Sequence, residues 1–304
     1  MSDVITTTST ATGPIPLALN DAIILTAARS AAVASDKFTM RRLGFNAGLT
    51  HRFNKHPGLT ASAVGETDAV FEAQGNAVVA VTLTAAQQAV AVRRSETLSD
   101  IAETTYEPSL LIEIGRAMTD RVEALVLALA SALNGGTSVG TTGQVLSRTA
   151  LILGRQTLAT NKAASGNFGD GQTPAGLAGA MIFLSPKGTG DLEREMVGTS
   201  ASPFSSIDAT DILYSDGSKP AGYRGKIFGI PVFETENVQT VSSDRTGMIA
   251  MPSAIGVLYV GTPKVSTVSE RAAGKFFNRT IGDFYVGVGE LVDTFGVPIT
   301  YVAA

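Results

Sequence analysis

One segment, residues 107–136, constrains what this chain can fold into more than any other. Its large apolar residues recur at steps of three and four and so form one hydrophobic stripe along a helix: Leu111, Ile114, Met118, Val122, Leu125, Leu129 and Leu133. Pro108 suits a first helical turn, and Asn134-Gly135-Gly136 can adopt the left-handed conformations that end a helix. We therefore predict a helix over residues 108–133, about 26 residues and roughly 39 Å long. Its opposite flank should face water or a neighbouring subunit, because it carries Glu113, Arg116, Asp120 and Glu123.

The chain before this helix has too few large apolar residues to form a core of its own. Residues 1–16 are rich in Ser and Thr, which is typical of an arm, and we expect a neighbouring chain to hold it in place. Asn20-Asp21 could cap a helix that runs to about residue 34. From residue 63 to residue 92 the pattern changes to the period of two that is typical of strands. Residues 46–92 are therefore predicted to form a long β-hairpin that projects from the body.

The chain after the long helix reads as a mixed α/β domain. Helices are predicted over residues 147–163 and 191–197, and a further helix start is predicted at residues 252–255. Extended segments are predicted at residues 180–184, 227–233, 248–251, 264–269, 284–288 and 297–302. This alternation indicates that the second half of the chain contains a sheet covered by helices.

Composition excludes several classes of chemistry. The 304 residues include no cysteine, so disulfides, thiolate metal sites and cysteine nucleophiles are impossible. His51 and His56 are the only histidines, and we interpret both as residues of a surface loop. The net charge is −4, and no stretch reaches the length of about 20 apolar residues that a membrane span requires. We accordingly expect no catalytic residue, no cofactor, no metal and no membrane contact.

The charges are distributed unevenly along the sequence. Residues 36–56 carry five Lys or Arg residues against one acid, and residues 95–125 carry mainly acids. Either both segments are solvated faces, or the basic segment of one subunit docks near the acidic segment of another. The second interpretation predicts inter-subunit contacts by Arg41, Arg42, Arg52, Lys55, Glu103, Glu107 and Glu113. The sequence leaves both interpretations open.

An arm, a projecting hairpin, a long helix and a mixed α/β domain follow one another in an order that resembles the major capsid protein of tailed bacteriophages. Three short motifs strengthen the resemblance. Residues 63–66 (AVGE) stand where that family's extended loop carries a V-x-E pattern. Residues 229–238 (GIPVFETENV) are similar to its G-x-P-V-x-x-S-x-N-V stretch, and residues 248–255 (MIAMPSAI) resemble the strand and P-x-A segment that follow. The match spans nearly the whole chain, and the resemblance rests on the order and spacing of these elements and motifs.

This resemblance implies an α+β chain with the Hong Kong-type capsid fold. Residues 1–45 would be the N-terminal arm, 46–92 the extended loop (E-loop), and 93–174 the peripheral domain with its spine helix. Residues 175–262 would form the axial domain, and residues 263–304 would return to the peripheral domain. Because no long helical segment precedes the arm, we expect scaffolding to be a separate protein. Some relatives crosslink a loop lysine to an asparagine, and Lys55 and Asn278 are the available pair here, but we expect no crosslink.

The function implied by the resemblance is structural. The chain would assemble into the hexamers and pentamers of an icosahedral phage head around double-stranded DNA, together with a portal and possibly a decoration protein. It would be assembled in the cytoplasm of a host bacterium and reside in the virion capsid. An encapsulin, which encloses a cargo enzyme with the same fold, is the nearest alternative. A cytosolic α/β enzyme is a different class, and the sequence offers no cluster of acid, base and nucleophile to support it.

Overall fold

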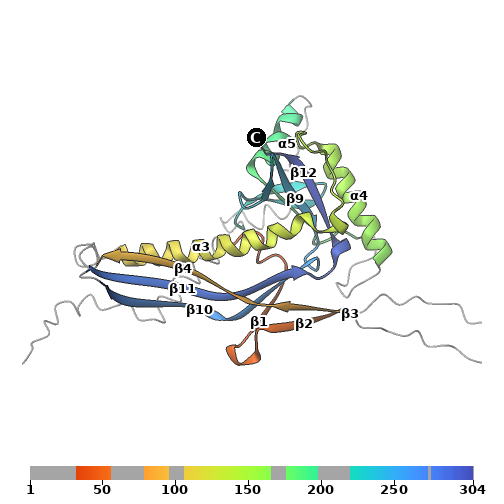
Figure 1. Ribbon diagram of the computed structural model, residues 1–304. Helices are drawn as coiled ribbons and strands as arrows, with labels where there is room; N and C mark the ends of the chain where they lie inside the picture. The colour runs from red at the N-terminus through yellow and green to blue at the C-terminus, as the bar shows by residue number, and fades with distance from the viewer. Residues whose placement is uncertain are drawn as a thin grey trace, which may run out of the picture.

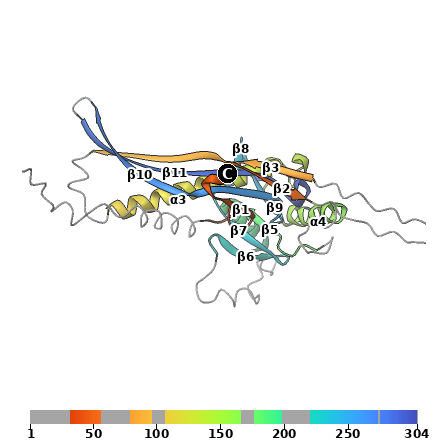
Figure 2. The same ribbon diagram turned by 90° about the horizontal axis from the view of Figure 1, so that it is seen from below.

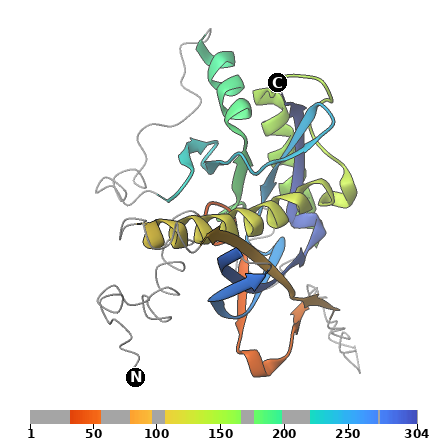
Figure 3. The ribbon, with the colours of Figure 1, turned by 60° about the vertical axis from the view of Figure 1, so that its left-hand side comes forward.

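The computed structural model describes residues 32–55, 79–95, 106–165, 176–197, 220–272 and 275–303, and these residues form two large β-sheets, a small two-stranded sheet and one long helix between the large sheets. Helix α3 (Tyr106–Ala128) lies along a four-stranded sheet with the order β1-β10-β11-β4. A second sheet, with the order β12-β9-β5-β7-β6, rises beside one end of the helix (Figure 1). In the view of Figure 3, α3 runs between the two sheets.

Helix α3 confirms the central sequence prediction. Leu111, Ile114, Met118 and Val122 are buried, as the apolar stripe requires. The α-helix ends at Ala128, five residues before the predicted end, and tightens into a 3-10 turn over Leu129–Ser131. The chain then turns through Asn134, Gly135 and Gly136, which all have positive φ and so end the helix as predicted.

The four-stranded sheet is a long plate. Strands β10 (Ile255–Ala272) and β11 (Lys275–Glu290) form an antiparallel pair of 18 and 16 residues, and β4 (Ala86–Ser95) pairs antiparallel with β11. Strand β1 (Thr39–Leu43) lies parallel to the start of β10. Seen from below, β4, β11 and β10 extend in the same direction as α3 (Figure 2). Gly282 on β11 permits close packing, because a side chain there would overlap Ile114 and Met118 of the helix.

The six-stranded sheet combines β5 (Met181–Leu184), β6 (Tyr223–Ile227), β7 (Ile230–Glu234), β9 (Asp244–Ala250) and β12 (Gly296–Val302), and β8 (Gln239–Val241) pairs with β9. Helix α4 (Arg148–Ser165) packs on β12 and β9, and helix α5 (Pro186–Val197) follows β5 directly. These elements confirm the helix predicted at residues 147–163 and the strands predicted at residues 180–184, 248–251 and 297–302. Helix α5 begins five residues earlier than predicted, because Pro186 occupies its first turn, where no backbone donor is lost.

A small third sheet forms the root of the predicted hairpin. Strands β2 (Thr50–Lys55) and β3 (Val79–Thr84) pair antiparallel, and residues 56–78 lie outside the described part of the chain. Residues 86–92, which we predicted within the hairpin, instead form the edge strand β4 of the long plate. His51 lies on β2 and not in a loop, with its ring edge-on to Phe53.

Two further predictions need correction. The predicted helix start at residues 252–255 is wrong, because β10 begins at Ile255 and its first residues are buried between β1 and β11. The extended run predicted at residues 227–233 is two strands, because Phe228 and Gly229 both have positive φ and turn the chain back. Strand β12 pairs with β9 in the six-stranded sheet, whereas β11 lies in the four-stranded sheet. Helix α4 also packs on the six-stranded sheet.

The predicted arm and its helix, residues 1–31, lie outside the described residues, whereas residues 39–43 of the predicted arm form β1. Among the helices that the structure describes, none is both long and apolar enough to cross a bilayer.

Candidate functional site

The most unusual polar site lies where the chain enters the described body. The backbone N–H groups of Val33, Ala34 and Ser35 all donate to the carboxylate of Glu123 on α3. Oε1 accepts from Val33 at 3.2 Å and from Ser35 at 2.8 Å, and Oε2 accepts from Ala34 at 2.7 Å. Glu123 is only 1% exposed. Hydrogen bonds from several N–H groups compensate a buried carboxylate for the water that it loses.

The electrostatics of this site follow from its burial. Burial raises the pKa of the Glu123 carboxyl above its ordinary value, and the hydrogen bonds from Val33, Ala34 and Ser35 act in the opposite direction. The Ser35 side chain also hydrogen-bonds Tyr259 of β10, and burial raises the pKa of Tyr259 to about 12. The tyrosine is therefore neutral and able to donate a hydrogen bond throughout the physiological range.

Apolar contacts tie the same segment to the six-stranded sheet. The Phe38 ring packs against Phe183 of β5 with a centroid distance of 5.6 Å, and Phe183 stacks on Phe233 of β7 at 5.5 Å. The Lys37 ammonium lies 5.6 Å from the centre of the Phe233 ring. Residues 33–38 thus contact the long helix and the six-stranded sheet, and β1 continues them into the four-stranded sheet. We call residues 33–38 together with Glu123 the arm anchor.

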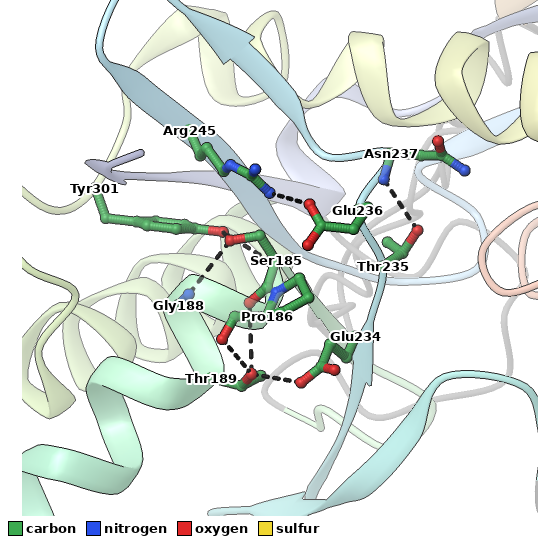
Figure 4. A network of polar contacts seen from close by, with 10 residues as sticks. All are labelled: Ser185, Pro186, Gly188, Thr189, Glu234, Thr235, Glu236, Asn237, Arg245 and Tyr301. Atoms are coloured by element: carbon green, nitrogen blue, oxygen red, sulfur yellow. Dashed lines mark hydrogen bonds and ion pairs between the residues drawn. The ribbon is translucent and has the colours of Figure 1, made fainter. Parts of the chain in front are cut away.

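A second buried polar cluster caps helix α5 (Figure 4). The Tyr301 hydroxyl accepts from the Ser185 N–H at 2.9 Å and donates to the Ser185 hydroxyl at 3.0 Å. The Ser185 hydroxyl also accepts from the Gly188 N–H, and Thr189 donates to Glu234. Burial raises the pKa of Tyr301. These contacts satisfy the Gly188 N–H in the first turn of α5 and join the helix to β12 and β7.

Within the described residues, no three His, Cys, Asp or Glu side chains gather closely enough to hold a metal ion. Both buried polar sites connect elements that are distant in sequence: the first connects residues 33–35 to α3, and the second connects α5 to β12 and β7.

Comparisons with known proteins were made with the sequence and with the structure. No family model matches the sequence, and no curated protein matches it. The structure, in contrast, superimposes on the capsid of Ralstonia phage GP4 with a TM-score of 0.64 and 14% identity, covering 90% of this chain and 92% of that chain. The head of Helicobacter pylori bacteriophage KHP40 matches with a TM-score of 0.58 and 12% identity, covering 87% of both chains. The chain has the Hong Kong-type capsid fold.

The same fold extends beyond phage heads. A virus-like particle from Pyrococcus furiosus matches with a TM-score of 0.54 and 12% identity over 94% of this chain and 98% of that chain. At these identities the likeness establishes the capsid fold and not the assignment of individual residues.

The basic residues that we predicted as contacts of the capsid fold lie on β1 and β2. Arg41 and Arg42 are exposed on the edge strand β1, and the Arg42 guanidinium lies 5.6 Å from the centre of the Tyr259 ring. Arg52 is exposed on β2, and Lys55 is the last residue of that strand.

The acidic residues are less uniform than the sequence suggested. Glu113 is exposed and forms an ion pair with Arg116 at 2.8 Å, while Glu107 lies in the first turn of α3 and Glu103 lies outside the described residues. Glu123, which we placed on the exposed flank, is buried in the arm anchor. From residue 109 onward, where the side chains of α3 are described, the exposed charges balance, with Glu113 and Asp120 against Arg116 and Arg121.

Sequence reasoning missed the arm anchor because it assumed that only one flank of α3 is covered. The buried residues Thr119, Glu123, Leu127 and Ala130 form a second stripe beside the apolar one. In the sequence, Leu127 and Ala130 lie beside the predicted apolar stripe. These two apolar residues could have indicated that the buried face of the helix is wider than one stripe.

Proposed function

We propose that this chain is a major capsid protein whose copies assemble into the hexamers and pentamers of an icosahedral tailed-phage head around double-stranded DNA. The observation that carries this proposal is the correspondence of its fold with phage capsid subunits over 90% of the chain. The shape supports it physically. A 23-residue helix backed by strands of 18 and 16 residues makes a stiff plate, which suits tiling better than the enclosure of a small substrate.

In this proposal the predicted segments take roles in the shell. Residues 1–45 are the N-terminal arm, and the E-loop begins at residue 46, has β2 and β3 as its root, and ends before β4 at residue 85. The peripheral domain is α3 with the four-stranded sheet, and the axial domain is the six-stranded sheet with α4 and α5. This division follows the strand pairing, so β12 and α4 join the axial domain and β4 joins the peripheral domain.

The shell is proposed to need further proteins but no cofactor. A separate scaffolding protein, a portal and a decoration protein are the partners that such a head implies, and the enclosed DNA is held without sequence-specific contacts. Assembly would take place in the cytoplasm of the host bacterium, and the mature location would be the virion capsid. We propose no enzymatic activity.

The experiment that tests this proposal is negative-stain electron microscopy of the purified protein. The absorbance of the same fraction is read at 260 and 280 nm. We expect closed shells or capsomer-sized rings, because the arm and hairpin leave surface that only a neighbouring copy can bury. A monomer that forms no particles across a range of salt and protein concentrations would contradict the proposal.

An encapsulin-like compartment is the second candidate, and the match to the virus-like particle from Pyrococcus furiosus is the observation that favours it. Particles purified from cells that also contain the phage genome distinguish the two. Nucleic acid inside the particles supports the phage head, whereas a co-purifying protein cargo without nucleic acid supports the compartment.

We further propose that Arg41, Arg42, Arg52 and Lys55 contact acidic residues of a neighbouring subunit, among them Glu103, Glu107 and Glu113. Within one chain, β2 and the first turns of α3 lie at different ends of the long plate (Figure 1), so these charges are positioned to meet between copies. A single exposed ion pair contributes only about 0–1 kcal/mol. The contribution repeats at every interface of a shell, however, and like charges at the same positions would oppose docking.

Reversing two of these charges, with Arg52→Glu and Lys55→Glu, is therefore expected to weaken assembly. The subunit concentration at half-maximal assembly should rise about tenfold, which corresponds to about 1.4 kcal/mol per subunit, and added salt should reduce the difference. Light scattering across a salt series measures both effects. The matched control is Arg155→Glu with Arg194→Glu, which changes the net charge equally on exposed positions of α4 and α5. If both double variants assemble like the original chain, the basic residues form only a solvated face.

A further inference from the structure

The arm anchor has a feature that ordinary packing does not require. Residues 33–35 precede β1 and belong to no helix or strand, so their N–H groups have no regular backbone partner. One side chain, Glu123, accepts from all three of them. Apolar contacts alone could bury Ala34 and Phe38, which are 0% and 4% exposed, but they would not set the direction of the backbone. Hydrogen bonds to three consecutive N–H groups do set that direction.

We propose that Glu123 is an assembly latch: its carboxylate fixes the point and direction at which residues 1–31 leave the body, and thereby governs their contact with a second copy of the chain. This inference rests on the proposed shell function for the second copy. The latch itself rests on the geometry within one chain. Glu123 touches no partner subunit in this scheme and is a positioning residue.

The position of the latch limits its action to the segment that precedes β1. Val33 packs on Gly222, beside β6, so closely that a side chain at Gly222 would overlap it. Phe38 packs on Phe183 of β5, and both the N–H and the hydroxyl of Thr39 donate to the carbonyl oxygen of Pro252. From Thr39 onward the chain is therefore held by the pairing of β1 with β10 and by Pro252, independently of Glu123. Releasing the carboxylate would free residues 33–35 and leave β1 in place.

The composition of the N-terminal residues indicates that they would contact a second copy of the chain rather than their own. Residues 1–16 are mostly Ser, Thr and small residues, which supply too little apolar surface to fold on their own chain. Fully extended, residues 1–31 could span at most about 100 Å, far enough to reach a neighbouring subunit in a shell. A fixed exit direction limits the volume that such a segment searches and raises its effective concentration at the neighbour.

The test replaces Glu123 with glutamine and follows the N-terminal segment in the unassembled subunit. Glutamine offers only one acceptor oxygen, and its amide N–H₂ group would face at least one backbone donor. We expect hydrogen exchange of the amides of residues 33–35 to rise by about 10- to 100-fold, the factor that corresponds to the loss of a charge-assisted hydrogen bond. Tryptic cleavage after Lys37 should accelerate by a similar factor. Exchange of amides in β9 and β12 should not change.

Two further variants complete the design. Glu123→Asp keeps the charge but is one methylene shorter, so it should give the same faster exchange at residues 33–35. This variant covers the case in which Glu123→Gln fails to fold. Glu113→Gln removes an exposed carboxylate from the same helix and should leave exchange and cleavage unchanged.

Measurements of assembly then distinguish a failure of the latch proposal from a failure of the proposed shell function. If the original chain assembles, Glu123→Gln should raise its half-maximal assembly concentration at least about tenfold, while Glu113→Gln should change it much less. Unchanged exchange at residues 33–35 in both Glu123 variants would overturn the latch, and so would faster exchange with undiminished assembly. Failure of the original chain to assemble would instead refute the shell function, and the exchange result would still report on the geometry of the latch.

Discussion

Replacing Phe183 with alanine is expected to destabilise the subunit by about 3–5 kcal/mol, because the residue is fully buried and packs against two other rings. Phe38 of the arm anchor and Phe233 of β7 both contact Phe183, so the cavity would open where the arm anchor meets the six-stranded sheet. Denaturant unfolding of the unassembled subunit, with the midpoint and slope measured together, gives the change in the free energy of unfolding.

The matched control for this prediction is Leu153→Ala on α4. Leu153 is 49% exposed, so removing its side chain should change the free energy of unfolding by no more than about 0.5 kcal/mol. Phe183→Leu keeps most of the volume and should cost about 1.5 kcal/mol or less. A loss below about 1 kcal/mol for Phe183→Ala would mean that the Phe38 and Phe233 rings do not depend on Phe183 for their packing.

The elements that the sequence predicted well are those whose signals are local. Helix α3 has a stripe of regular period and two clear terminal signals, Pro108 in its first turn and Asn134-Gly135-Gly136 after it, and its position followed from these alone. Strands β5 and β9 were recognised because each is a short apolar run with punctuation on one or both sides. The resemblance to capsid proteins rested on the order of such elements, and the structural comparisons confirm the fold that it implied.

The errors arose where distant segments decide the local structure. Residues 252–255 look like the start of a helix, but Ile255 pairs with Glu290 and begins a strand because β1 and β11 flank it. Phe228 adopts a positive φ that is uncommon for any residue other than glycine, so its turn has no clear sequence signal. Glu123 was predicted to face water or a neighbouring subunit because a carboxylate is rarely buried, and its three hydrogen-bond donors are about 90 residues away in sequence. The arm anchor could not be predicted without the tertiary contact that creates it.

A glycine of the long plate, Gly287, determines how closely the root of the hairpin can be attached to the plate. Strand β3 turns into β4 across the face of the plate opposite α3. A Cβ at Gly287 of β11 would lie 2.5 Å from the carbonyl oxygen of Thr84 and 3.0 Å from the Ala85 nitrogen. Both atoms belong to the main chain at the bend, which cannot move aside as a flexible side chain can. The absence of a side chain at Gly287 is therefore what lets the hairpin root lie against the plate.

We accordingly expect Gly287→Val to displace the root of the hairpin and to destabilise the subunit by at least about 1–3 kcal/mol, the usual cost of overpacking. Gly289→Ala should cost less, because its added carbon would meet Leu83, whose side chain can change rotamer. Gly44→Ala is the control, since no atom lies within 4 Å of the added carbon and φ is −70° there. Thermal unfolding ranks the three variants, and hydrogen exchange in β2 and β3 locates the damage.

The same three glycine variants also test whether the direction of the hairpin root controls assembly of the proposed shell. If the hairpin must leave the plate in a fixed direction to reach a neighbour, Gly287→Val should abolish particles at protein concentrations where Gly44→Ala still assembles. Gly289→Ala should then assemble with an intermediate yield, in step with the exchange measured at its hairpin root. Normal particles from Gly287→Val, together with faster exchange in β2 and β3, would show that the direction of the hairpin root is not what controls assembly.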